Sequence, residues 1–330
     1  MMQNYLNLFN QSLRLTIDKY PPNFIQYNDF DNGLKLLFKY NDNYQQQMAL
    51  IIVFAIIMTI IRKPLWTNFI RNILIKNGYV SARKERKFIE SGWAFSFYSL
   101  TTIIAFYIIQ NNDFLNDPSR IFADFKIEQP IPSTIKYLYW MEIGFYIHSI
   151  YAVYFINSWK YDSLVMIIHH AVTLFLLLFS YWARVYNVGV VVIYFHDICD
   201  VILEGSKCLV CLKFSLIKYL ESKIRIINLI WFIVAWFYYR IYLFPMIALM
   251  ESIKFINTTL TNDLLTFVYG LFIFLWIIYC LNIFWAMLII NLIINSVWRK
   301  NRKIDDPRDS DGEDDDDEMV DNNSNKNKKD

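Results

Sequence analysis

Residues 163–204 contain two apolar blocks, SLVMIIHHAVTLFLLLFSYW at Ser163–Trp182 and VGVVVIYFHDICDVILE at Val188–Glu204, separated only by ARVYN at 183–187. An apolar run of about 20 residues is long enough to cross a bilayer as an α-helix. Because the connection is short, the two helices must be antiparallel neighbours. These blocks predict an all-α integral membrane protein.

The composition of the whole chain agrees with this prediction. Hydrophobic residues make up 56% of the 330-residue chain and charged residues 19%, whereas soluble domains contain about 25% charged residues. Five further apolar blocks lie at about 48–61, 92–110, 137–156, 226–250 and 264–294. The predicted fold therefore has about seven transmembrane helices.

Two segments do not fit a simple span. The block 48–61 is shorter than a bilayer requires, so its ends are expected to extend into the flanking residues. The segment 208–220 is too short and too rich in lysine to cross, and it is expected to form an interfacial helix. The last block, 264–294, is long, so it is expected to tilt or bend.

Glycine and cysteine usage excludes several kinds of site. The eight glycines are scattered along the sequence, which excludes a Gly-rich loop that cradles phosphates. Cys208 and Cys211 form one C-x-x-C pair without a second pair, so the four cysteines predict neither a disulfide framework nor a zinc site. They are interpreted as structural, with palmitoylation of Cys208 or Cys211 as the alternative.

Charge is distributed unevenly. The formal net charge is +2, but residues 305–330 carry a net charge of −8, so the rest of the chain carries +10. With seven spans, the segments on the side of the C-terminus hold 18 lysines and arginines, against 9 on the opposite side. The positive-inside rule then predicts a lumenal N-terminus and a cytosolic C-terminus. The glycosylation sequons at Asn10 and Asn257 both fall on the predicted lumenal side, whereas the sequon at Asn322 would be cytosolic and silent.

Ionisable residues are concentrated inside the predicted spans, where each costs about 3 kcal/mol on insertion scales and is a functional candidate. They are Glu142, His148, His169, His170, His196, Asp197, Asp200, Glu204 and Arg240. Helical spacing places His196, Asp200, Glu204 and Lys207 on one stripe, with Asp197 beside it. On the preceding span, His169 shares a face with Thr173 and Ser180. Counted from the predicted cytosolic ends, the histidines and aspartates meet at one depth.

A carboxylate beside an imidazole raises its basicity and fixes its tautomer, which prepares the other ring nitrogen as a base or nucleophile. A site that faces the cytosol and is open to lipid suits acyl transfer from an activated donor. Three alternatives stay open: purely structural hydrogen bonding, a metal site of His and Asp ligands, and a receptor or channel. Four histidines are too few for a di-iron desaturase site, and the last span lacks a retinal-type lysine.

The stretch HHAVTLFLLLFSYWARVYNVGVVVIYFHDICDVILEGSK, at 169–207, resembles the Lag1 motif of ceramide synthases. The matching positions are His169, His170, Thr173, Phe179, Ser180, Tyr181, Gly189, His196, Asp197, Asp200, Leu203, Glu204 and Lys207. KFIESGWAFSFY at 87–98, YLYWMEIGFY at 137–146 and RIYLFP at 240–245 are also similar to family segments. The resemblance covers about 83–298, the extent of a TRAM-LAG1-CLN8 (TLC) domain, and implies that six of the helices form one bundle.

The sequence departs from the family at two places. Asn187 stands where the family usually has an arginine, and an arginine is found instead at position 184, so a contact of the lumenal loop is expected to differ. The segment 62–91 is too short for the homeobox-like insert that many animal members carry.

The resemblance implies N-acylation of a sphingoid base, such as sphinganine, by a fatty acyl-CoA, giving (dihydro)ceramide. It implies catalytic roles for four residues: His169 as the acylated group or the base, His170 as its assistant, and Asp197 and Asp200 as the groups that orient the imidazoles. The expected supporting residues are His196, Glu204, Lys207, Arg240, Thr173 and Ser180. No cofactor, metal or nucleic acid is expected, because the thioester supplies the activation. The alternative is a non-catalytic TLC protein that senses, transports or chaperones lipids.

The predicted organisation is a lumenal segment 1–47, a transmembrane anchor 48–61, a cytosolic basic linker 62–82, the TLC catalytic domain 83–298 and a disordered acidic cytosolic tail 299–330. The tail has an acidophilic-kinase site at Ser310 and a dilysine pattern at 326–328, which indicates the endoplasmic reticulum membrane. Homo- or heterodimers are usual for the family. The family's chain-length selectivity is attributed to the lumenal loop, here about 251–263, and the residues do not translate into a carbon number.

Overall fold

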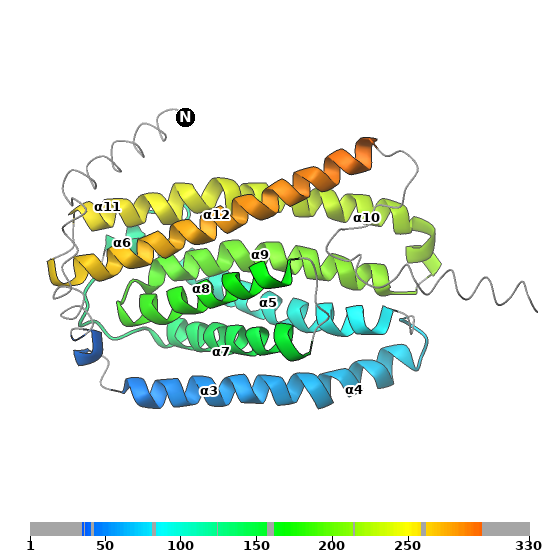
Figure 1. Ribbon diagram of the computed structural model, residues 1–330, viewed down its shortest axis with the longest axis horizontal. Coiled ribbons are helices and arrows are strands. Elements are labelled where there is room, and N and C mark those ends of the chain that lie inside the picture. The colour runs from blue at the N-terminus through cyan, green and yellow to red at the C-terminus, as the bar shows by residue number, and fades with distance from the viewer. Residues whose placement is uncertain are drawn as a thin grey trace, which may run out of the picture.

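The computed structural model describes residues 35, 37–40, 43–80, 84–123, 125–156, 162–213, 215–258 and 262–298. The described chain is helical, with no strand beyond one isolated bridge between Val80 and Leu212. Long helices run side by side along the length of the molecule (Figure 1). The prediction of an all-α bundle is confirmed.

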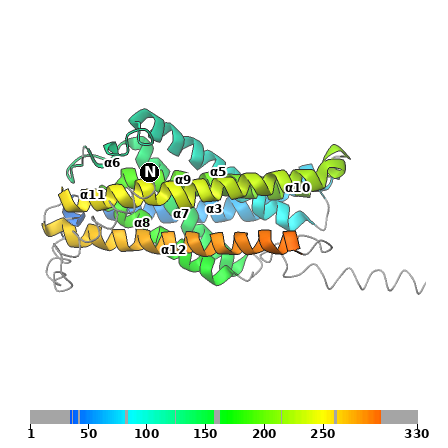
Figure 2. The same cartoon turned by 90° about the horizontal axis from the view of Figure 1, so that it is seen from above.

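In the described part of the chain, seven long helical bodies build the bundle, and several are continuous across changes of helix type. They are α3 (Tyr44–Ile60) with η2 (Ile61–Trp66), α4 (Thr67–Ile70) and η3 (Arg71–Ile75); α5 (Glu85–Asn112); α7 (Ser133–Phe155); α8 (Ser163–Trp182); α9 (Tyr186–Cys211); α10 (Ser215–Ala235) with η5 (Trp236–Leu249) and α11 (Met250–Thr258); and α12 (Asn262–Trp298). A short helix, α6 (Arg120–Ala123), lies between α5 and α7. The body α10–η5–α11 runs beside α12, as the view from above shows (Figure 2).

Five stretches of these helices are long and apolar enough to cross a membrane: Tyr44–Ile75, Glu85–Asn112, Ser163–Trp182, Lys223–Thr258 and Phe267–Asn291. The protein is therefore a multi-pass membrane protein. The other two predicted spans, α7 and α9, lie among these helices (Figure 1). Helix α9 packs against α5, α6, α8, α10 and η5, and Leu209 is its only exposed residue. Its burial shows that α9 is the inner helix of the bundle, which is where its polar residues can be shielded from lipid.

The helices extend further than the apolar blocks indicate. The first helix continues through Pro64 to Ile75, so most of the segment predicted as a basic linker is helical. The turns around Pro64 are π-helical, a form that relieves the missing backbone donor of proline. Pro245 lies in the π-helical segment η5 in the same way. The predicted selectivity loop is also helical as far as Thr258, because α11 continues from η5.

The interfacial helix predicted at 208–220 is not formed as one element. Helix α9 continues through Cys211, and α10 begins at Ser215. The end of α9 is held in place because Cys211 is buried in a cluster with Ile70, Val80 and Phe88. The backbone N–H of Lys213 also donates to the carbonyl oxygen of Tyr79 at 2.8 Å. Tertiary packing therefore overrides the lysine-rich composition of this segment.

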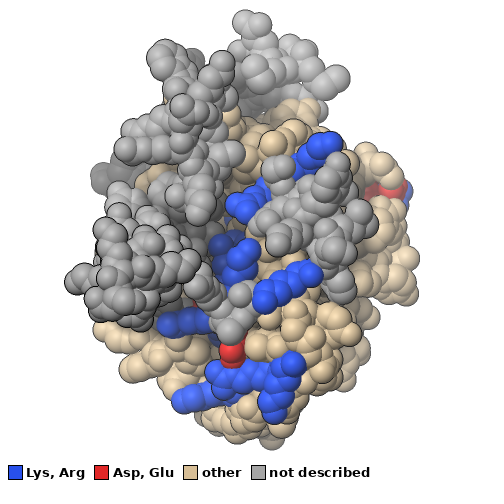
Figure 3. All heavy atoms as spheres, turned by 90° about the vertical axis from the view of Figure 1, so that its right-hand side faces the viewer, with Lys and Arg blue, Asp and Glu red and all other residues tan. Residues whose placement is uncertain are grey.

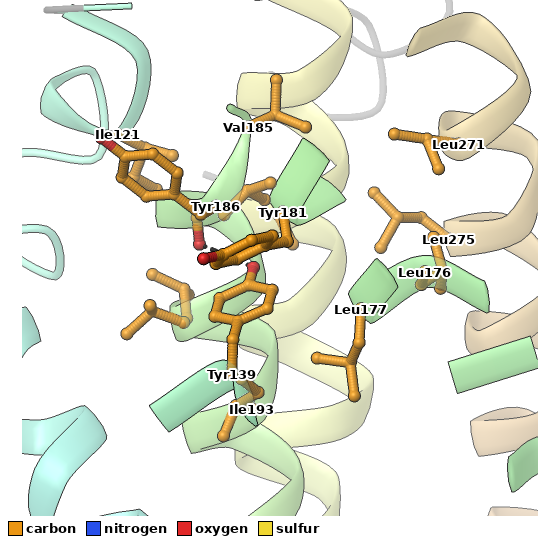
Figure 4. Packing of buried hydrophobic residues seen from close by; sticks show 14 of the residues in the cluster. Ile121, Tyr139, Leu176, Leu177, Tyr181, Val185, Tyr186, Ile193, Leu271 and Leu275 are labelled. Carbon is orange, nitrogen blue, oxygen red and sulfur yellow. Dashed lines mark hydrogen bonds between the residues drawn. The ribbon is translucent and has the colours of Figure 1, made fainter. Parts of the chain in front are cut away.

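Helices α7, α8 and α9 approach closely around one tyrosine. The Tyr139 hydroxyl donates to the carbonyl oxygen of Tyr186 at 2.9 Å and lies 3.2 Å from the Ser180 hydroxyl, and Figure 4 shows Tyr139 pointing toward Tyr186 and Tyr181. Gly189 lies directly beside it, because an added Cβ would be 1.8 Å from the Tyr139 hydroxyl oxygen. Ser180, predicted to support catalysis, therefore contributes to helix packing here.

The turn between α8 and α9 is tied to neighbouring segments. Arg184 has a left-handed backbone conformation, with φ of 62°, and its guanidinium donates to the carbonyl oxygens of Tyr40 at 2.9 Å and Ile127 at 3.4 Å. The Asn187 amide donates to the carbonyl oxygen of Ile121 at 3.1 Å. These two side chains hold the residues around α6 against the turn. We call this end of the bundle the turn end.

The opposite end of the bundle is basic. Exposed lysines and arginines lie where α5 begins and where the first helix and α9 end: Lys63, Arg71, Lys76, Arg86 and Lys213. Figure 3 shows this face, on which blue side chains greatly outnumber red ones. Two of the glutamates there pair with arginines, Glu85 with Arg71 and Glu90 with Arg86. We call this end the basic end.

Candidate active site

A polar cavity of about 240 Å³ lies between the helices on the side of the basic end. Its lining includes His169 and His170 from α8, Asp200, Glu204 and Lys207 from α9, and Arg240 from η5. The sequence predicts that the histidines and aspartates meet at one depth. Of these, His169, His170 and Asp200 line this cavity, whereas His196 and Asp197 do not. The lining residues named above come from three different helices, so the arrangement depends on the packing of α8, α9 and η5.

His169 and His170 are the two imidazoles in this cavity, each 7% exposed. Their ring centroids are 5.7 Å apart, and the edge of Trp285 holds the His169 ring at 5.2 Å. The Nδ1 atom of each ring is buried without a hydrogen-bond partner. Among the described residues, none forms a hydrogen bond with either Nε2, and both rings line the cavity. An unprotonated Nε2 at such a position can act as a nucleophile or a base.

His196 has a different role, because both of its ring nitrogens have partners. Its Nδ1 lies 2.8 Å from the carbonyl oxygen of Val192, which only accepts, so Nδ1 carries the proton. Its Nε2 lies 3.3 Å from the side-chain amide nitrogen of Asn282 and accepts from it. Asn282 is fully buried on α12 and was not identified from the sequence. The His196 ring lies 6.2 Å from that of His169 and supports it by packing.

Asp200 is neutralised by Arg240 rather than by an imidazole. Arg240 Nη2 lies 2.8 Å from Asp200 Oδ1 and also donates to the carbonyl oxygen of His196 at 2.8 Å. The guanidinium stacks over the Trp236 ring, 4.1 Å from its centroid. The other acid–base pair of the stripe is Lys207 with Glu204, at 2.8 Å. The predicted supporting residue Arg240 is thus the counter-ion of a predicted catalytic aspartate.

Asp197 does not line the polar cavity. It is 1% exposed, and the hydroxyl of Thr101 on α5 donates to its Oδ2. Within the described chain, no hydrogen bond joins His169 or His170 to a carboxylate. Direct orientation of these two imidazoles by Asp197 and Asp200 therefore stays a prediction.

The first helix completes the wall of the polar cavity. Arg62 lines the cavity and its Nη1 donates to His148 Nε2 at 3.2 Å. His148 Nδ1 therefore carries the proton and donates to the Thr59 hydroxyl at 2.9 Å, which in turn donates to the carbonyl oxygen of Ala55 at 2.9 Å. This chain of hydrogen bonds fixes a buried guanidinium beside the histidine pair. Sequence analysis singled out His148 but not Arg62.

A second, apolar cavity of about 60 Å³ runs from the site toward the turn end. Tyr146, Thr173 and His196 line it at the site, and Phe122 and Phe255 line it near the turn end. Those two phenylalanine rings stack with centroids 4.3 Å apart. Tyr146 lines both cavities. A narrow apolar channel that begins beside Tyr146 and His196 is suited to an alkyl chain.

A metal centre was one of the alternatives raised by the sequence. In the part of the chain that the structure describes, no group of three or more His, Cys, Asp or Glu side chains is arranged to hold a metal ion. Asn257, the predicted glycosylation site, lies in the last turn of α11. Asn10, Ser310 and the acidic tail lie outside the described residues.

The Arg240–Asp200 pair allows a direct test of the site's charge balance. Arg240→Leu is expected to lower the free energy of unfolding by about 2 kcal/mol, because it leaves Asp200 and the His196 carbonyl without their donor. The effect stays below the 3–5 kcal/mol of a fully buried pair because the Asp200 side chain is 23% exposed. Arg240→Leu combined with Asp200→Leu is expected to recover stability. Thermal unfolding in detergent micelles measures the stability of the single and the double variant. An Arg240→Leu protein as stable as the wild type would contradict the pairing.

Comparison with known proteins agrees with this geometry. The family model for the TLC domain (TRAM_LAG1_CLN8) matches residues 87–291. Human ceramide synthase 1 is 35% identical over 183 residues, which are 54% of this chain and 52% of that protein. The mouse ceramide synthase 1 is 32% identical over 210 residues, 62% of this chain and 60% of that protein. Ceramide synthase LOH1 of Arabidopsis thaliana is 27% identical over 257 residues, 73% of this chain and 78% of that protein.

The alignments with the two mammalian proteins thus span only about half to three-fifths of those relatives' own length. The TLC-domain match, by contrast, covers more than half of this chain and includes α5, α7, α8, α9, η5 and most of α12. These helices carry the histidine pair and most of the residues that line the two cavities. The chain belongs to the TLC-domain (TRAM-LAG1-CLN8) family.

Proposed function

We propose that the protein is a ceramide synthase, which transfers a fatty acyl group from acyl-CoA to the amino group of a sphingoid base such as sphinganine. The observation that carries the proposal is the position of His169 and His170. They lie in a polar cavity on the side of the basic end, beside the start of an apolar channel. An acyl donor with a charged head group and an apolar tail matches the polar cavity with its head and the apolar channel with its tail. The names of the similar proteins support the same reaction.

The proposed chemistry uses one imidazole nitrogen. In the first route, His169 Nε2 attacks the thioester carbonyl carbon, the C–S bond breaks, and the thiolate of CoA leaves and takes up a proton. The amine then attacks the acyl-imidazole, the C–N bond to the ring breaks, and the amide forms. The ring takes up the proton that the amine loses, which replaces the proton that the ring gave to the thiolate. In the second route, His169 Nε2 removes a proton from the amine, whose nitrogen attacks the thioester carbonyl carbon. The C–S bond then breaks, and the departing thiolate of CoA takes the proton back from the imidazolium. No cofactor enters either route, because the thioester is already activated.

The proposal assigns an orientation to the molecule. The basic end would face the cytosol, where its lysines and arginines attract the phosphates of CoA, and the turn end would face the lumen of the endoplasmic reticulum. The apolar channel would hold the acyl chain, and the acceptor would approach from the bilayer. Assembly as a homo- or heterodimer is part of the same proposal.

The test is an acyl-transfer assay on the purified full chain in lipid nanodiscs. Incubation with sphinganine and acyl-CoAs of several lengths is expected to give N-acyl product, detected by mass spectrometry, and to reveal the preferred chain length. Glycerol 3-phosphate as the acceptor serves as a control and is expected to give no product. Absence of product with every acyl-CoA, together with retained binding of sphinganine or acyl-CoA, would favour a protein that senses, transports or chaperones lipids.

A further inference from the structure

Two carboxyl groups are buried together behind the polar cavity. Glu142 on α7 is 0% exposed and Asp197 on α9 is 1% exposed, and neither lines the cavity. Their side chains lie within hydrogen-bonding reach of each other, with Thr101 of α5 beside both. Three helices therefore place two acids and one hydroxyl at a single point of the core.

The hydrogen bonds at this point leave Glu142 without a donor. The Thr101 hydroxyl donates to Asp197 Oδ2. Both carboxyl oxygens of Glu142 are buried and accept no hydrogen bond from the residues that the structure describes. A carboxylate that is fully buried and accepts no hydrogen bond costs several kcal/mol. The arrangement is therefore unfavourable if Glu142 is ionised.

The nearby cations do not remove this cost. The guanidinium of Arg240 is engaged by Asp200 and by the His196 carbonyl, and Lys207 is engaged by Glu204. Both ring nitrogens of His196 are in use. Tyr98, Tyr146 and Cys199 are further ionisable side chains among the described residues near the pair, and none of them carries a positive charge. Two adjacent negative charges would then face each other without a counter-ion.

We propose that Glu142 is a neutral carboxylic acid whose hydroxyl donates a hydrogen bond to Asp197, so that the pair holds one proton and one negative charge. Two ionised carboxylates only accept, so they can hydrogen-bond to each other only when one of them carries a proton. The proton explains why Glu142 accepts no hydrogen bond, because the protonated Glu142 is itself the donor. Asp197 is then a carboxylate that accepts from both Thr101 and Glu142. Glu142 is thus a positioning residue that acts through Asp197.

The shared proton also sets the charge of the site. Asp200 is balanced by Arg240, so the Glu142–Asp197 pair leaves one negative charge in the buried core. The part of this inference that concerns activity rests on the proposed acyl transfer. In that reaction the acceptor arrives as an ammonium ion, and an imidazolium forms when the acceptor is deprotonated. One fixed negative charge near the cavity complements that single positive charge without needing to move.

The spectroscopic test uses the wild-type chain in nanodiscs and requires no substrate. Infrared spectra are expected to show the carbonyl stretch of a protonated carboxylic acid at neutral pH, shifted in D₂O. The band is expected to disappear in Glu142→Gln, because exposed carboxyl groups are ionised at this pH. A wild-type spectrum without the band, or a band that persists in Glu142→Gln, would overturn the proposal.

The activity test compares two substitutions at the same position. Glu142→Gln keeps a donor toward Asp197 and is expected to retain acyl transfer within about threefold of the wild type. Glu142→Ala removes the donor and is expected to lose about tenfold to a hundredfold, the size expected for a hydrogen bond to a charged group. Thr101→Val, which removes the other donor, serves as the matched control and is expected to show a loss of the same order.

Equal loss in the Gln and Ala variants, with both shown to be folded by size-exclusion chromatography, would show that Glu142 must ionise and would refute the assignment. An inactive wild type with the infrared band present would refute only the proposed function.

Discussion

Replacing His169 by alanine is expected to reduce acyl transfer by at least about a hundredfold while the protein stays folded. His169 lines the polar cavity, and its Nε2 has no hydrogen-bond partner among the described residues. Its removal deletes the group that would attack the thioester or deprotonate the amine. The loss is expected in kcat rather than in binding of acyl-CoA, because the phosphate-attracting side chains at the basic end are untouched. Initial rates with sphinganine and one acyl-CoA measure it.

Val165→Ala is the matched control for this substitution. Val165 lies one turn before His169 on α8 and packs in the same half of the bundle, but it does not line the polar cavity. It is expected to keep most of the activity, so a loss specific to His169→Ala reports on chemistry rather than on α8 packing. Normal turnover by His169→Ala would contradict the assignment of His169, and His170→Ala would then identify the reacting ring.

Gly189→Ala is expected to destabilise the bundle by at least about 3 kcal/mol, at the upper end for an overpacked core. The new Cβ would lie 1.8 Å from the Tyr139 hydroxyl oxygen and 3.0 Å from Tyr139 Cζ. Tyr139 cannot easily turn away, because it is fully buried and donates to the Tyr186 carbonyl, as Figure 4 shows. Either α7 and α9 separate or the hydrogen bond breaks. The shift in thermal unfolding temperature measures the loss.

Gly270→Ala on α12 controls for the change of glycine itself. Nothing lies within 4 Å of an added Cβ there, and alanine is favoured over glycine in a helix by about 1 kcal/mol. This variant is expected to be as stable as the wild type or more so. Tyr139→Phe removes the atom that clashes most and is expected to recover part of the loss when combined with Gly189→Ala. A Gly189→Ala protein of wild-type stability would show that α7 and α9 do not approach this closely.

The fold could be predicted largely because membrane spans are defined by apolar length. The block Ser163–Trp182 coincides with α8, and the short connection after it is the observed turn. The errors occur where helices continue past the apolar residues. Lysines and arginines after Ile61 do not interrupt backbone hydrogen bonding, so the first helix reaches Ile75, and Glu251 and Ser252 are buried within α11. Composition marks the bilayer, whereas helix ends are decided by packing and by breaks in hydrogen bonding.

The candidate site was predicted only in part, for a different reason. Spacing along one helix shows which residues share a face, and it grouped Asp200 with Glu204 and Lys207, which line the same cavity. It does not show which face meets which neighbour. The pairing of Asp200 with Arg240, of His196 with Asn282 and of Asp197 with Thr101 depends on the rotation of four different helices. Threonine and asparagine inside apolar runs also carry too weak a signal to be identified without these contacts.

The hydrogen-bonded chain from Arg62 through His148 has a consequence for how the protein can be divided. The matched family domain begins at residue 87, yet the first helix ends at Ile75 and brings a wall residue of the polar cavity. A fragment cut at the domain boundary would expose that wall to lipid tails. In chimeric proteins, the first helix should therefore be exchanged together with α7, since the two share one polar contact. The smallest transplantable unit begins near Tyr44.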